Sequence, residues 1–127
     1  MAERKIVFLD THAVVWLYEG IKVFSKKSLD LMNQSDLRMS PMLRLELQML
    51  HQLNRIDHPY DILSSLKRDF YFDEEQVDFS KLITQSLSIN FTRDPFDRLI
   101  VGHAKLANQK LITKDQDILE NFDGAVW

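Results

Sequence analysis

The chain has 127 residues, 45% hydrophobic and 28% charged, which fits one globular domain spanning residues 1–127. Sixteen basic and 19 acidic residues give a net charge of −3, which excludes a basic field over the whole molecule. The lack of cysteine excludes disulfides, thiolate zinc sites and cysteine nucleophiles. The apolar runs are too short for a membrane span or a signal peptide. We therefore expect a soluble cytoplasmic protein that does not associate with membranes.

Apolar spacing and turn signals predict short strands that alternate with helices. In chain order, the pattern predicts a strand at 5–10, helices at 11–19 and 25–34, a strand at 37–40, helices at 42–53 and 59–67, a brief strand or packed connection at 70–72, helices at 79–87 and 94–108, a strand at 110–113, a short helical turn and a strand at 125–127. Thr11 and Ser40 are expected to cap the helices that follow them. The helix at 42–53 is expected to be largely buried, because its apolar residues cover more than one face.

Strands separated by helices of about ten residues imply crossover connections and a mainly parallel sheet flanked by helices. The fold class is therefore predicted to be α/β. In such folds, ligands bind beyond the carboxyl ends of the strands. Residues that follow the predicted strands are thus the first candidates for a functional site.

Acidic residues occupy several of these positions. Asp10 follows the first strand and Asp115 the penultimate one, so both should face the same edge of a parallel sheet. Asp94 and Asp97 lie in the first turn of a helix that could begin near this edge. Glu46 lies on an otherwise apolar helix, and a buried carboxylate needs a partner.

Each acid also has a purely structural interpretation. Asp94 and Asp97 would make a good helix start together with the intervening proline, and Asp115 and Asp117 can cap the turn that follows them. Glu46 could lie in a narrow polar seam. Taken singly, these residues leave both interpretations open.

Considered together, the acids favour a functional interpretation over a structural one. Two carboxylates about 5 Å apart repel each other by roughly 3 kcal/mol at an effective dielectric constant of about 20, so a cluster needs cations or shifted protonation. Mg²⁺ is typically held by carboxylates, water and substrate phosphate. This combination is typical of metal-assisted phosphodiester hydrolysis, in which the metal activates a bound water.

Basic residues near the acids are candidates for contacts with an RNA backbone. Arg93 and Arg98 flank Asp94 and Asp97, and three lysines form a local basic patch. These lysines are Lys22, Lys26 and Lys27. The alternative for both groups is an ordinary solvated surface that balances charge.

Two histidines and one aromatic group are given mainly structural interpretations. His12 and His103 have no matching nucleophile, so structural roles are favoured over acid–base catalysis. An apolar group around Gly20 is interpreted as partly core, with an exposed remainder suited to a partner helix. It comprises Trp16, Tyr18, Val23 and Phe24.

Four short motifs, in a fixed order between Ile6 and the C-terminus, carry a family resemblance. They are Phe8-Leu-Asp-Thr-His-Ala13, Leu45-Glu46-Leu47, Arg93-Asp-Pro-Phe-Asp-Arg98 followed by Leu99-Ile100, and Leu111-Ile-Thr-Lys-Asp115. Together they resemble the PIN-domain ribonucleases, in particular the VapC-type toxins of bacterial toxin–antitoxin pairs. The segment 58–77 matches nothing specific in that family.

The resemblance implies a three-layer α/β/α domain with an acidic pocket that binds Mg²⁺ or Mn²⁺ and cleaves RNA. Its catalytic and metal-binding acids would be Asp10, Glu46, Asp97 and Asp115, flanked by Asp94 and Asp117. Thr11 and Thr113 would lie beside the acids as hydrogen-bonding hydroxyls. The resemblance also implies a small cognate antitoxin protein and self-association into a homodimer.

Two other functions compete with the nuclease. A binding module with the same fold could act through a protein partner without catalysis. In an aspartyl-phosphate phosphotransfer domain, Asp10 would be a covalent nucleophile. However, His12 stands where dehalogenase-like enzymes need a second Asp, and only one acid follows the first strand where receiver domains have a pair.

Overall fold

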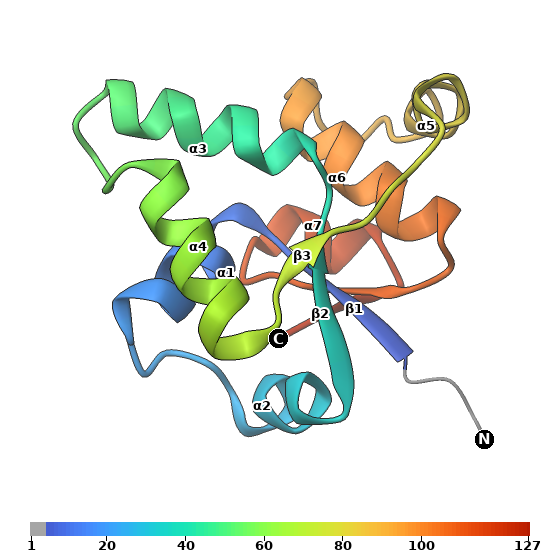
Figure 1. Ribbon diagram of the computed structural model, residues 1–127. Helices are drawn as coiled ribbons and strands as arrows, with labels where there is room; N and C mark the ends of the chain where they lie inside the picture. Colours follow the sequence, from blue (N-terminus) through green and yellow to red (C-terminus); the bar gives the residue numbers. More distant parts are fainter. Residues whose placement is uncertain (1–4) are drawn as a thin grey trace.

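The computed structural model of the protein describes residues 5–127 and has a five-stranded sheet at its centre (Figure 1). The strands are β1 (Lys5–Leu9), β2 (Ser35–Met39), β3 (Asp73–Glu74), β4 (Lys110–Ile112) and β5 (Ala125–Val126). All neighbours pair in parallel, in the order β3-β2-β1-β4-β5. β1 is central, pairing Phe8 with Arg38 of β2 on one side and with Leu111 of β4 on the other. The predicted α/β fold with a mainly parallel sheet is confirmed.

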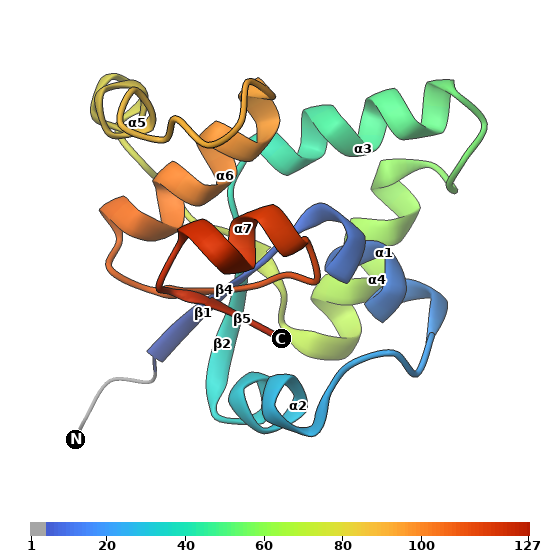
Figure 2. The same cartoon turned by 180° about the vertical axis from the view of Figure 1, so that it is seen from behind.

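Helices connect the strands and flank the sheet. They are α1 (Thr11–Glu19), α2 (Lys26–Asn33), α3 (Met42–Gln52), α4 (Pro59–Phe70), α5 (Phe79–Ser86), α6 (Pro95–Leu106) and α7 (Gln116–Asn121). From either side, α3, α5 and α6 lie above the sheet, while α1, α2 and α4 lie beside and below it (Figures 1 and 2). Within residues 5–127, no helix is long and apolar enough to cross a membrane.

The core brings the helices that carry candidate acids toward the end of β1. Phe8 and Leu9 of β1 are almost fully buried, as are Leu43 and Leu47 of α3 and Ile100 of α6. α3 packs against both α1 and α6. The helix that carries Glu46 therefore contacts both the helix that starts directly after β1 and the helix that carries Asp97.

Two predicted helix caps are wrong. Asp10, not Thr11, is the N-cap of α1, and its side chain accepts a hydrogen bond from the backbone N–H of Thr11. Pro41 is the N-cap of α3 and lacks a side chain that can cap. The Ser40 hydroxyl is buried and has no hydrogen-bond partner among residues 5–127. Sequence spacing placed each cap one residue away from its true position, because it could not show where each strand ends.

One further helix boundary is corrected, and one of two alternatives for the segment that follows it is confirmed. α4 is longer than the predicted helix at 59–67 and ends at Phe70, where Tyr71 terminates it in the left-handed region at φ 55°. Phe72 is buried and the short strand β3 follows it, so the segment 70–72 is a packed connection.

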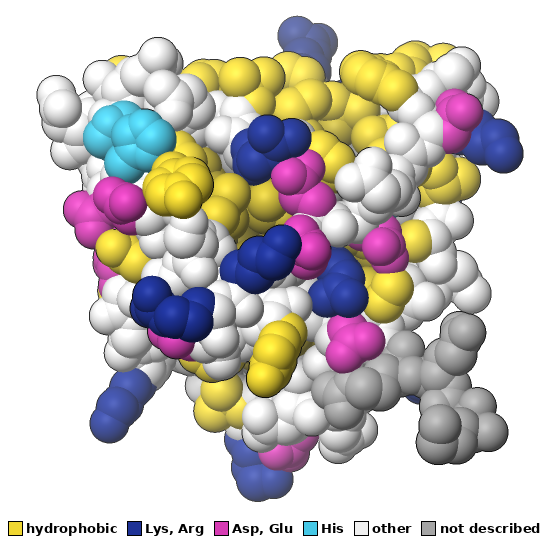
Figure 3. All heavy atoms as spheres, viewed as in Figure 1, with side chains coloured by type: hydrophobic (Ala, Val, Ile, Leu, Met, Phe, Trp, Pro, Cys, Tyr) yellow, Lys and Arg dark blue, Asp and Glu magenta, His cyan; other side chains and the backbone are white. Residues whose placement is uncertain are grey.

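α3 is also less buried than its sequence predicts. Leu43 and Leu47 are buried, but Leu45 is 55% exposed and Leu53, directly after the helix, is 62% exposed. Apolar side chains gather along the upper edge of the molecule, over α3 and α5 (Figure 3). The apolar residues on more than one face of this helix therefore supply an exposed surface as well as core.

Gly102 sets the distance between α5 and α6. A Cβ at this position would lie 2.4 Å from the Oγ of Ser86 and 3.3 Å from its Cα. The Ser86 hydroxyl is itself held by a 2.7 Å hydrogen bond to the carbonyl of Leu82. The missing side chain at Gly102 therefore allows the two helices to pack closely.

Candidate active site

Asp10 is a buried carboxylate held by two short hydrogen bonds. The hydroxyl of Thr113 donates to its Oδ2 at 2.6 Å, and the backbone N–H of Thr11 donates to its Oδ1 at 2.6 Å. Asp10 comes directly after the central strand β1, and only 7% of the residue is exposed. Burial raises the pKa of Asp10, and the negative charge of Asp115 acts in the same direction. The structure therefore fixes this carboxylate and makes its ionisation costly.

Glu46 of α3 meets the start of α1. The hydroxyl of Thr11 donates a hydrogen bond to its Oε1. Thr11 thus contacts Asp10 through its backbone and Glu46 through its side chain, so one residue links the two acids. Partial burial raises the pKa of Glu46, and the charges of Asp10 and Asp94 raise it further.

Asp94 and Asp97 have different environments at the start of α6. Asp94 is exposed and caps the helix, accepting from the backbone N–H of Phe96 at 2.8 Å. Asp97 is half-buried, and burial raises its pKa to about 7. Four other carboxylates contribute to that rise: Asp94, Asp10, Asp115 and Glu46. Asp97 is therefore the point at which the fields of the other acids converge.

Asp115 and Asp117 lie at the start of α7. Asp115 is the N-cap, and its Oδ1 accepts from the backbone N–H of Ile118 at 3.0 Å. The backbone N–H of Asp115 donates to the hydroxyl of Thr113, which itself donates to Asp10. Asp117 is exposed and is not among the largest contributors to the pKa shifts of the other acids.

The candidate acids form no ion pair with a basic side chain among residues 5–127. None of the ion pairs that the structure describes in residues 5–127 involves Asp10, Glu46, Asp97 or Asp115. Arg98 donates to the backbone carbonyl of Thr92 rather than to an acid. The site therefore carries a local excess of negative charge.

The donor chemistry fits a hard divalent cation, although the side chains are not gathered into a finished metal site. Within residues 5–127, no three His, Asp or Glu side chains are grouped closely enough to hold a metal ion. Hydrogen bonds to Thr11 and to the amide of Ile118 engage oxygens of Glu46 and Asp115. Carboxylate oxygens with unbalanced charge are nevertheless the ligands that Mg²⁺ and Mn²⁺ prefer.

The basic candidates lie apart from these hydrogen bonds. Arg93 is exposed, and Lys26 pairs with Asp30 of the same helix at 3.0 Å. Lys22 and Lys27 are exposed. Sequence reasoning missed two other residues, Lys114 and Trp127, because their placement depends on contacts across the fold.

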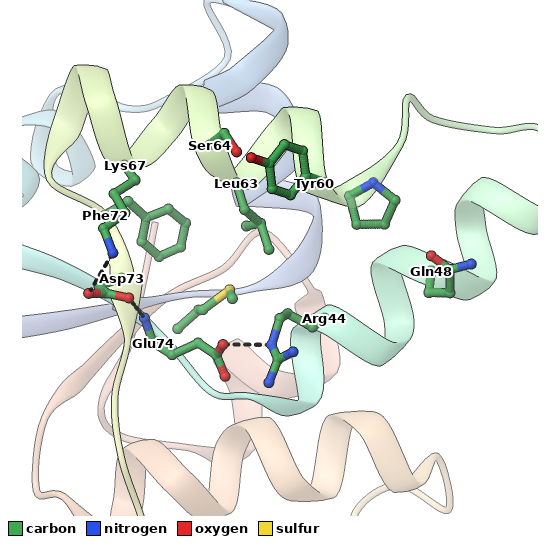
Figure 4. A pocket seen from close by; sticks show the side chains of 11 residues that line it. Arg44, Gln48, Tyr60, Leu63, Ser64, Lys67, Phe72, Asp73 and Glu74 are labelled. Atoms are coloured by element: carbon green, nitrogen blue, oxygen red, sulfur yellow. Dashed lines mark hydrogen bonds and ion pairs between the residues drawn. The ribbon is translucent and has the colours of Figure 1, made fainter.

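A cavity of about 360 Å³ opens beside Asp10 and Asp115, and its other lining residues are His12, Trp16 and Lys114. A larger cavity of about 430 Å³ lies elsewhere, between α3, α4 and β3 (Figure 4). In that larger cavity, Arg44 pairs with Glu74 and Lys67 with Asp73. Only the smaller cavity contains acids of the candidate site.

With this architecture and site in place, comparison with known proteins identifies the family. The sequence model of the PIN domain matches residues 7–124, so the chain belongs to the PIN domain family. No protein among those with curated descriptions matches the chain significantly in sequence.

Two solved structures share the fold over nearly their whole length. One is VapBC2 from Rickettsia felis bound to a DNA fragment from its promoter, with a TM-score of 0.63 and 16% identity over 95% of this chain and 96% of that chain. The other is DNA-bound VapBC from Salmonella typhimurium, with a TM-score of 0.62 and 14% identity over 95% of each chain. At this identity, the likeness shows the fold.

Proposed function

We propose that the protein is a Mg²⁺- or Mn²⁺-dependent endoribonuclease that hydrolyses RNA phosphodiester bonds. One observation carries this proposal: burial and then the charges of four other carboxylates raise the pKa of Asp97 to about 7, and no ion pair that the structure describes in residues 5–127 engages it. Carboxyl groups whose pKa is strongly raised by burial and by neighbouring charges cluster at functional sites, and a bound cation would stabilise their ionised form. Membership of the PIN domain family supports the same activity.

Each acid has a defined part in this mechanism. Asp10, Glu46, Asp97 and Asp115 would hold the cation, with Asp94 at the flank. A cation held by these residues would supply Lewis acidity, lowering the pKa of a bound water and stabilising negative charge on the phosphate oxygens. The hydroxyl of Thr113 keeps Asp10 oriented, and that of Thr11 keeps Glu46 beside it. Arg93 and Arg98 would contact the RNA phosphates flanking the acids.

The proposed biological role is that of the toxin in a toxin–antitoxin pair. Support comes from the fold shared with the VapBC structures of Rickettsia felis and Salmonella typhimurium. A small antitoxin protein would then bind this chain and block its acidic site. The exposed apolar residues of α3 and α5, among them Leu45 and Phe79, support a further part of the proposal, self-association into a homodimer.

The activity test uses purified protein and a pool of structured and single-stranded RNAs. Cleavage is measured with Mg²⁺, with Mn²⁺ and with EDTA, for the wild type and for Asp97→Asn. Asp123→Asn is the matched control, because Asp123 is an exposed aspartate outside the site. We expect metal-dependent cleavage by the wild type and the control, and a loss of at least a hundredfold in Asp97→Asn.

Other results would change the assignment. Equal cleavage by the wild type and Asp97→Asn would show that a contaminating nuclease or a different site is responsible. A wild type that neither cleaves any RNA nor binds Mn²⁺ would instead point to a binding module that acts through a partner. Co-purification of a small protein encoded beside this chain would support the pairing with an antitoxin.

A further inference from the structure

The cavity beside Asp10 is lined by acidic side chains and by aromatic and cationic ones. Asp10 and Asp115 supply carboxylates, and His12, Trp16 and Lys114 complete the lining. His12 is exposed and Trp16 is half-buried, so both present part of their rings to solvent. The opening therefore joins candidate metal ligands directly to aromatic and cationic side chains.

Aromatic rings continue away from this cavity as a connected series. The rings of His12 and Trp16 lie 5.8 Å apart, centroid to centroid, and Trp16 meets Trp127 edge-on at 5.8 Å. Trp127 in turn lies 5.3 Å from Phe24. We call His12, Trp16 and Trp127 the aromatic cluster. These two ring contacts restrain the Trp16 side chain, so it loses little conformational freedom when a ligand packs against it.

Lys114 brings the positive charge of this cavity. Its Nζ lies 5.6 Å from the centroid of the Trp127 ring, within the range of a cation–π contact. No ion pair that the structure describes in residues 5–127 engages Lys114. Its charge is thus available to a phosphate beside the aromatic cluster.

We propose that the aromatic cluster stacks the base of the nucleotide next to the scissile phosphate, while Lys114 contacts the adjoining backbone phosphate. This inference rests on the proposed ribonuclease function and adds a base-binding subsite to it. Sequence-tolerant binding of single strands combines aromatic stacking with cationic contacts to the backbone.

The larger cavity is less suited to RNA. It also contains an exposed aromatic residue, Tyr60, but its two cations are already paired with Glu74 and Asp73 (Figure 4). Neither of these cations is therefore available to a phosphate. Tyr60 is therefore a matched control: it is an aromatic residue that lines a cavity where we expect no RNA to bind.

The protein itself offers the probe, because its only two tryptophans, Trp16 and Trp127, belong to the aromatic cluster. Single-stranded hexauridylate is titrated into Asp97→Asn protein with Mg²⁺, following tryptophan fluorescence and anisotropy of a terminal label. The comparison ligand is a hexamer with the same phosphates but without bases. We expect hexauridylate to quench the tryptophans and to bind at least tenfold more tightly than the abasic hexamer.

Single variants then show which residues cause the preference for hexauridylate. In the same background, Trp16→Leu and His12→Ala should each weaken hexauridylate at least fivefold and leave the abasic hexamer unchanged, whereas Tyr60→Leu should change neither. His12 is exposed, so His12→Ala keeps the test valid if Trp16→Leu lowers stability. Equal affinity for both hexamers, no binding of either, or a loss confined to Tyr60→Leu would overturn the proposal.

This result can be separated from the fate of the proposed activity. One outcome is that the wild type cleaves RNA in a metal-dependent way while the protein shows no preference for hexauridylate over the abasic hexamer. That combination would overturn only the stacking proposal. A clear preference without cleavage under any metal would leave an RNA-binding surface and remove the nuclease.

Discussion

Thr113 couples two acids through a single hydroxyl. It donates to Asp10 and accepts from the backbone N–H of Asp115, so the orientation of one carboxylate and the position of the other depend on the same side chain. This hydrogen bond also lowers the pKa of Asp10 and opposes the effect of burial. Removing the hydroxyl should therefore change both structure and charge.

Thr113→Val tests this coupling with little change of shape. We expect a loss of about 1–2 kcal/mol in the free energy of unfolding, because a buried carboxylate loses a donor, and at least a tenfold loss of RNA cleavage. Thr84→Val is the control, since it removes an exposed hydroxyl that donates to the carbonyl of Ser80. Chemical denaturation measures the change in the free energy of unfolding, and cleavage assays measure the change in activity. Full activity in Thr113→Val would contradict the role given to the hydroxyl.

Ionisation of Asp97 should lower the free energy of unfolding at neutral pH. Its pKa is about 7 in the folded protein and 3.8 for an ordinary aspartate, so the folded state becomes less stable as the pH rises from about 4 to 7. At pH 7.5, Asp97→Asn should therefore be more stable by about 1–2 kcal/mol after solvent screening. Mg²⁺ should raise the Tm of the wild type more than that of the variant. A lower Tm in Asp97→Asn without metal would contradict this assignment.

His103 creates the opposite pH dependence. It is 1% exposed and packs on Phe8 at 4.7 Å, and burial lowers its pKa to about 4 from an ordinary 6.5. The unfolded chain takes up a proton first, so the contribution of neutral His103 is complete above pH 6.5 and is lost as the pH falls toward 4. It can reach about 2–3 kcal/mol. The structural role expected for this histidine agrees with its burial.

The measurement compares the wild type with His103→Gln, using urea denaturation between pH 4.5 and 7.5. The variant should show a weaker loss of stability on acidification than the wild type. Taking the difference between the two proteins cancels the contributions of Asp97, Asp10 and Glu46. Parallel stability profiles for the two proteins would show that His103 does not titrate as its burial implies.

At the scale of elements, the contact between α5 and α6 depends on a missing side chain. Gly102→Ala would bring a Cβ to 2.4 Å from the Oγ of Ser86. We expect a loss of about 1–3 kcal/mol from overpacking, although alanine favours the helix. In the double variant with Ser86→Ala, most of that loss should be recovered, because the nearest atom is gone. A double-mutant cycle from thermal unfolding measures the coupling. Additive effects would place the clash elsewhere.

Elements with local signals could be predicted from the sequence. α2, α5 and α6 begin where Ser25, Asp78 and Asp94 cap them, and the side chains that cap them are neighbours in the chain. The helix start at Asp94-Pro95 is visible without any knowledge of the fold. Local chemistry of this kind is encoded within a few residues, so the sequence predicts these three helices near their true bounds.

Features that depend on distant contacts could not be predicted. The exposure of Leu45 is decided by the helices that do or do not cover it, and the contact between Trp16 and Trp127 joins residues at opposite ends of the chain. In the candidate site, the choice between Asp94 and Asp97 needed the resemblance to a family. The structure adds a physical distinction, because Asp94 caps a helix while Asp97 carries the raised pKa.

At the scale of the whole molecule, the apolar surface over α3 and α5 bears on assembly. Leu45 and Phe79 are 55% and 61% exposed and line a common cavity of about 340 Å³. If two copies associate through it, Leu45→Lys should shift the protein from dimer to monomer in light scattering. Leu29→Lys is the control, since Leu29 is an exposed leucine on α2. A wild type that is monomeric at high concentration would contradict this part of the proposal.

The central position of β1 also determines when the candidate site can form during synthesis. Asp10 is made early, but its hydroxyl partner Thr113 lies 103 residues later, and β4 must pair beside β1 before the two can meet. Closing so long a loop is slow and comes late in folding. A ribosome-bound chain that lacks its last strands therefore has no assembled site. A nuclease built on this topology would be inactive while it is being translated, and the RNA that encodes it would be safe until the chain is nearly complete.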